Sequence, residues 1–155
     1  MTWSNFVFAN FKRETTLAGV RKIQSTYDAH ANTFSSGVFM VTIVDEGAPM
    51  PAADVRDALS AFLASGIGRT LMSAVIHEGA GFRAAAVRSV VTGLAMAARL
   101  PYPHKVFSTV SDAASWFSAG ASQSLSAAMI VDVVAEARQR ALRDVAAPQR
   151  SIRRP

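Results

Sequence analysis

The residues of this sequence that could do chemistry gather where two predicted strands end. One apolar run ends at Asp45 and Glu46, and the next ends at His77 and Glu78. The carboxyl ends of parallel strands meet at one edge of a sheet, where open α/β folds bind their ligands. A histidine at that edge is suited to proton transfer, because its ordinary pKa lies near neutral pH.

The residues after Glu78 have the spacing of a dinucleotide-binding turn, with Gly79, Gly81 and Ala84 between a strand and a helix. Two features argue against a nucleotide. The turn follows the third strand of the chain, and the acid expected about 20 residues on is missing, since the next acidic residue is Asp112. We therefore interpret the glycines as a tight connection, whose free amides together with Arg83 could hold an anion.

These residues together form one predicted rim for a ligand or partner. It comprises Asp45, Glu46, His77, Glu78, Gly79, Gly81 and Arg83. The alternative is that charged residues simply end the strands at solvent. No catalytic residue is assigned, because no nucleophile or second carboxylate accompanies His77. The three histidines lack metal-ligand spacing and the chain has no cysteine, so we expect no metal, no cofactor and no enzyme activity.

Composition indicates a single globular domain. The chain has 155 residues, of which 50% are hydrophobic and 17% charged, which is apolar enough to fold around one core. We see no signal peptide and no apolar stretch long enough for a membrane span, which predicts a cytoplasmic protein of bacterial type.

The net charge of +5 comes largely from the end of the chain, at Arg150, Arg153 and Arg154. Such a basic tail could bind nucleic acid or an anionic membrane. A solvated, disordered tail is the simpler interpretation, because chain termini are often unstructured.

Periodicity predicts alternating strands and helices, and hence an α/β fold. We expect a four-stranded, mainly parallel sheet with flanking helices, plus an extra C-terminal helix. The predicted strands are 5–12, 38–44, 71–76 and 105–110, and the predicted helices are 15–27, 53–64, 82–100, 111–117 and 125–145. The predicted divisions are an α/β domain at 1–118, a joint and amphipathic helix at 119–147, and the basic tail at 148–155.

The helix at 82–100 is apolar on nearly all sides, so the sheet can cover only part of it. We expect its other side to be covered by the C-terminal helix or by a second subunit. The C-terminal helix must likewise dock on its own domain, on a second copy or on a partner. The predicted interface residues are Val87, Val91, Leu94, Leu125, Met129 and Val133.

One segment resembles a known family. Val106-Phe107-x-Thr109-x-x-Asp112-Ala113-x-x-Trp116-Phe117 is similar to the closing strand and helix of SpoIIAA-like (STAS-like) domains. The resemblance covers residues 5–118 and implies a small cytoplasmic α/β domain that acts by binding. Members of the family are switched by phosphorylation of a serine in a strand-to-helix turn. The corresponding turn at 45–51 contains no serine or threonine, so the switch is not carried over.

We therefore expect a non-catalytic regulatory or scaffolding module that acts through protein contacts and associates with itself. The alternative is a domain that binds a small anionic ligand, or acts on one, at the rim around Asp45, His77 and Arg83.

Overall fold

A computed structural model describes residues 1–11, 14–120 and 126–146 of the chain, as an α/β fold with one mixed sheet. None of the described helices combines the length and the apolar character that a membrane span requires. In chain order the elements are β1 (Thr2–Trp3), β2 (Phe6–Phe11), α1 (Leu17–Ala31), β3 (Val38–Val44), α2 (Ala53–Ser65), β4 (Thr70–His77), α3 (Gly81–Ala97), β5 (His104–Phe107), α4 (Val110–Gly120) and α5 (Ala127–Ala146).

The sheet has five strands in the order β1-β2-β3-β4-β5, one more than predicted. β2 to β5 are parallel, as expected for strands alternating with helices, and the additional strand β1 pairs antiparallel with β2. β1 has two residues and turns into β2 through Ser4, whose φ is 49°. A pair of residues is too short for an alternating pattern, so the sequence carried no signal for this strand.

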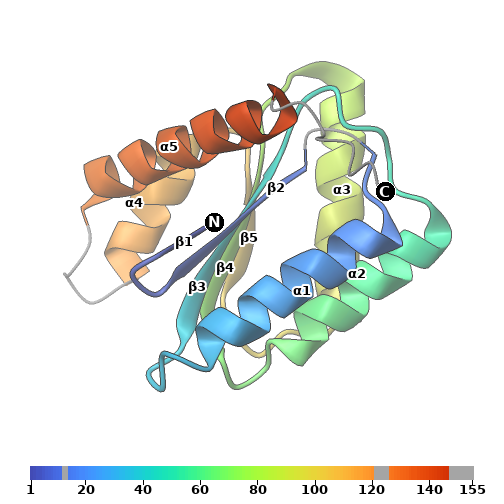
Figure 1. The fold of residues 1–155 in the computed structure, drawn as a ribbon. Helices are drawn as coiled ribbons and strands as arrows, with labels where there is room; N and C mark the ends of the chain where they lie inside the picture. Colours follow the sequence, from blue (N-terminus) through green and yellow to red (C-terminus); the bar gives the residue numbers. More distant parts are fainter. Residues whose placement is uncertain (12–13, 121–125, 147–155) are drawn as a thin grey trace, which may run out of the picture.

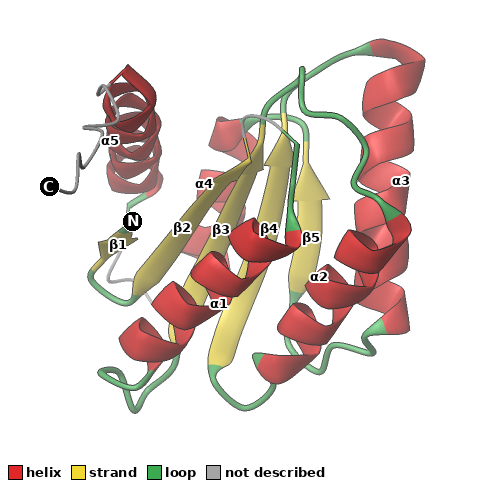
Figure 2. Cartoon of the chain, turned by 45° about the vertical axis from the view of Figure 1, so that its right-hand side comes forward, coloured by secondary structure: helices red, strands yellow, loops and turns green. Residues whose placement is uncertain are grey.

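Helices cover both faces of the sheet (Figures 1 and 2). α1, α2 and α3 lie on one face, and α4 and α5 lie on the other. Neighbouring parallel strands joined by right-handed crossovers place their helices on a single face, which explains the first group. The chain reaches the second face only after β5, the last strand.

The core on the face covered by α4 and α5 is built around aromatic rings. Phe117 of α4 is fully buried, and its ring meets those of Phe6 and Phe39 edge-on at centroid distances of 5.6 and 5.9 Å. These edge-to-face contacts add to the stabilisation that burial of the rings provides.

The position of α5 corrects one expectation. α5 does not cover α3, because the two helices lie on opposite faces of the sheet (Figure 1). Its apolar stripe packs against α4 and β2, within the same core as Phe6 and Phe117. The residues of this stripe are Ile130, Val133, Val134 and Ala137. The predicted boundary after residue 118 therefore does not separate α5 from the core, since α5 completes it.

Candidate ligand-binding site

The structure brings the predicted strand ends to one edge of the sheet. Val44 and His77, the last residues of β3 and β4, are partners in the parallel register. The imidazole of His77 is 1% exposed, and its Nδ1 lies 3.1 Å from the carbonyl oxygen of Val44. His77 is thus enclosed by the fold, and a molecule at the rim cannot reach it without a movement of the chain.

Other groups of the rim are also engaged within the chain. Glu78 forms an ion pair with Arg138 of α5. A Cβ atom at Gly79 would come within 3.2 Å of the Glu46 side chain, so this glycine allows a close approach of the two strand ends. Arg88 of α3 donates a hydrogen bond to the Gly79 carbonyl oxygen at 3.3 Å. These contacts fix the connection between β4 and α3.

The start of α3 has the geometry expected of a tight turn. Gly81 has a φ of 79°, a conformation that favours glycine, and no side chain caps the helix at Ala80. The side chain of Arg83 lies outside the described part of the structure. The anion site at this turn, like a role for Asp45, stays a prediction.

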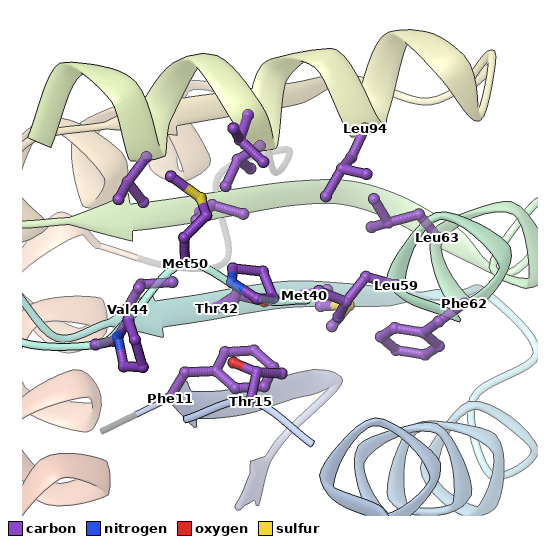
Figure 3. Close-up of a pocket in the computed structure, with 17 residues that line it drawn as sticks. Phe11, Thr15, Met40, Thr42, Val44, Met50, Leu59, Phe62, Leu63 and Leu94 are labelled. Carbon is purple, nitrogen blue, oxygen red and sulfur yellow. The ribbon is translucent and has the colours of Figure 1, made fainter. Parts of the chain in front are cut away.

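An apolar chamber that the sequence analysis did not find lies between the sheet and the helices α2 and α3 (Figure 3). β2, β3 and β4 form its floor, α2 and α3 its walls, and the loop at 48–51 part of its roof. Figure 3 shows Leu94 of α3, Leu59 of α2 and Met50 of the loop extending toward the same space. The lining consists of Phe11, Thr15, Met40, Thr42, Val44, Ala48, Pro49, Met50, Pro51, Leu59, Phe62, Leu63, Val75, Val87, Val90, Val91 and Leu94.

The chamber is a costly feature for the fold. Its free volume is about 90 Å³, in an interior where voids larger than a water molecule are few. At about 24 cal/mol per Å³, a closed void of that size would destabilise the protein by about 2 kcal/mol. An apolar occupant would restore the missing contacts. Apolar cavities of about 150 Å³ bind benzene, so this space suits a slender aliphatic group.

The loop at 48–51 forms the accessible part of the chamber. Met50 is 42% exposed, whereas Ala48 is 2% exposed. Pro49 and Pro51 restrict the backbone of the loop, and Arg56 of α2 donates a hydrogen bond to the Pro51 carbonyl oxygen at 2.9 Å. This part of the lining therefore combines a stiff backbone with the flexible, partly exposed side chain of Met50.

The predicted interface residues are distributed over both faces of the sheet. Val87, Val91 and Leu94 of α3 line the chamber; Val87 is buried, whereas Val91 and Leu94 are half-buried. Val133 is 7% exposed within the core that α5 completes. Val87 and Val133 are thus buried within the chain, whereas Val91 and Leu94 are partly exposed, and their role as contacts with a second copy stays a prediction. The amphipathic pattern showed that the helix faces are buried but not against what.

The other two predicted interface residues have different outcomes. Met129 is 44% exposed on α5, and its role as a contact stays a prediction. Leu125 lies outside the described residues, as do residues 121–124 of the predicted joint and the basic tail at 148–155.

A second, more open groove of about 490 Å³ lies between the last turns of α3 and β5. His104 lines it, with Nδ1 3.2 Å from the Ser73 hydroxyl oxygen and Nε2 buried without a described partner. Burial lowers the pKa of His104 below its ordinary value of 6.5. The groove carries Arg99 but no acidic residue among its described lining.

The lowered pKa of His104 predicts a pH dependence of stability. The unfolded chain binds the proton of His104 more readily than the folded chain does. The stability that neutral His104 contributes is thus present above the ordinary pKa of 6.5 and is lost as the pH falls through the folded-state pKa. We expect the free energy of unfolding in urea to fall between about pH 7 and pH 5, and to fall less in His104→Gln. Equal slopes in the two proteins would contradict this assignment.

Among the described residues, no group of three His, Asp or Glu side chains is placed to hold a metal ion. No family model, curated protein or solved structure matches the chain. The resemblance to SpoIIAA-like domains is therefore still a prediction.

Proposed function

We propose that this chain is a non-catalytic binding module whose chamber takes up a small apolar molecule. The observation that carries the proposal is the chemistry of the lining, in which every described side chain is apolar except for the hydroxyls of Thr15 and Thr42. Preformed apolar space with a few polar groups is typical of sites for small ligands. The predicted rim supports a ligand less well, because His77 is buried and Glu78 is paired with Arg138.

The methionines of the chain provide a test of this proposal. Met40 and Met50 line the chamber, whereas Met72 lies in the core of the opposite face and Met129 is exposed on α5. With ¹³C-labelled methionine methyl groups, titration with hexane should shift the resonances of Met40 and Met50. The resonances of Met72 and Met129 serve as internal controls. Shifts of all four methyl groups, or of none, would count against a site in the chamber.

A second candidate function is self-association through the outer side of α3. Phe82 is 91% exposed and Met96 is 75% exposed. At about 100° per residue these two side chains lie on the same side of the helix. We propose that a contact surface runs along this side of α3 between the two side chains, which are about 21 Å apart. This surface differs from the interface predicted on Val87 and Leu94.

Sedimentation velocity over a range of concentrations tests self-association. We expect the wild-type chain to form a dimer or larger species, and Phe82→Ser to shift it toward the monomer. Ile67→Ser is the matched control, because Ile67 is 48% exposed but lies outside α3. A wild-type chain that is monomeric at every concentration would rule out this second function.

A further inference from the structure

We infer that the occupant of the chamber is electrically neutral: a slender aliphatic molecule whose polar end is a hydroxyl, carbonyl or ester group. This inference rests on the proposed function and narrows it to one ligand class. Its basis is the combination of an uncharged lining with an excess of carboxylates in the chain segment that contains the loop at 48–51.

The lining offers no counter-charge for an ion. Among the described residues that form it, none is ionisable, and Thr15 and Thr42 are the only polar ones. Burying an unpaired carboxylate, phosphate or ammonium in such a space is strongly unfavourable. A threonine hydroxyl both donates and accepts a hydrogen bond, so it matches a neutral polar group. Thr42 is 8% exposed, which places one such hydroxyl within the interior.

The chain segment that contains the loop at 48–51 carries an excess of negative charge. Residues 45–57, which form the loop and the first turn of α2, contain four carboxylates and the single cation Arg56. Within this stretch four carboxylates thus oppose one cation, which disfavours the approach of an anion.

Two features near this loop could attract an anion: the guanidinium of Arg56 and the start of α2. A nearby group offsets the positive charge of each. The guanidinium of Arg56 is engaged by the Pro51 carbonyl oxygen at 2.9 Å. The start of α2 has no side-chain cap on Ala52, but Asp54 lies in its first turn and accepts a hydrogen bond from the Val55 amide. The carboxylate of Asp54 opposes the positive end of the helix dipole.

The shape of the lining indicates an extended group. Val87, Val91 and Leu94 line the chamber along two turns of α3, a length of about 10 Å. Met40, Thr42 and Val44 are alternate residues of β3, so they line the chamber from one face of the sheet. Since the free volume is only about 90 Å³, a long and narrow occupant fits better than a bulky ring system.

The test compares three probes of equal chain length: 1-octanol, octanoate and octylammonium. Each is titrated into the wild-type chain at neutral pH, and the methyl resonances of Met40 and Met50 report binding in the chamber. We expect 1-octanol to bind at least about tenfold more tightly than either ion, since each 1.4 kcal/mol of desolvation cost is a factor of ten. Thr42→Val should weaken the binding of 1-octanol and leave that of hexane unchanged.

The outcomes separate this inference from the proposed function. If octanoate binds as tightly as 1-octanol, the chamber binds apolar chains but the restriction to neutral ligands is overturned. The same holds if octylammonium binds as tightly. If no probe shifts Met40 or Met50, the proposed function fails and the inference fails with it.

Discussion

Replacing Ile130 with alanine is expected to lower the free energy of unfolding by about 2–4 kcal/mol. Ile130 is 2% exposed and belongs to the core that α5 completes over β2 and α4. Truncation to alanine removes apolar contacts and leaves a cavity, because the surrounding rings and strands cannot collapse fully into the space. Chemical unfolding in urea, followed by far-UV circular dichroism, measures the change.

Val131 provides the matched control, because it is the next residue of the same helix and is 37% exposed. Val131→Ala should change the free energy of unfolding by less than about 0.5 kcal/mol, as surface substitutions generally do. Equal effects at the two positions would mean that α5 does not dock in solution as described. Deleting α5 would expose the core face that α5 covers. A change in oligomeric state after such a truncation would therefore not identify an intermolecular contact of α5.

The second large effect is the loss of ligand binding that we expect when the chamber is filled. Val91→Phe places an aromatic ring where Val91 now borders the free volume, and it should weaken the binding of hexane or 1-octanol by at least about tenfold. The physical reason is steric, since a space of about 90 Å³ cannot hold both the added ring and a ligand. Isothermal titration of the folded variant, with its melting temperature recorded, measures the loss.

Two further variants make this result decisive. Ala61→Phe adds the same ring to an exposed position of α2, the other wall of the chamber, and should leave binding unchanged. Val91→Leu adds a single methylene to the lining and should weaken binding less than Val91→Phe, even if the larger ring disturbs folding. Unchanged binding in a folded Val91→Phe protein would exclude the chamber as the site.

Much of the fold could be predicted because several local signals agree. The β-branched run at 38–44 forms β3 with the predicted bounds. Thr16 caps the first helix, and its hydroxyl accepts a hydrogen bond from the Gly19 amide at 3.1 Å. Parallel strand order then follows from alternation of strands and helices, which is why the ends of β3 and β4 could be placed together.

The chamber could not be predicted in the same way. Val87 and Val91 have the same sequence signature as residues of a filled core, because periodicity reports burial and not packing density. The lining also comes from β2, β3, β4, α2 and α3, which are distant along the chain. Thr42, in an otherwise apolar strand, is the one signal of a polar group inside, and alone it does not indicate a cavity.

By itself, the sequence determined the class of the fold, the order of its elements and the absence of thiol chemistry, because these depend on local composition and periodicity. The tertiary structure decided which apolar faces meet. It placed α5 on the face opposite α3, enclosed His77 and left free space beside Val91. The physical reason is that the hydrophobic effect has no direction: it requires that a face be buried but does not specify its partner.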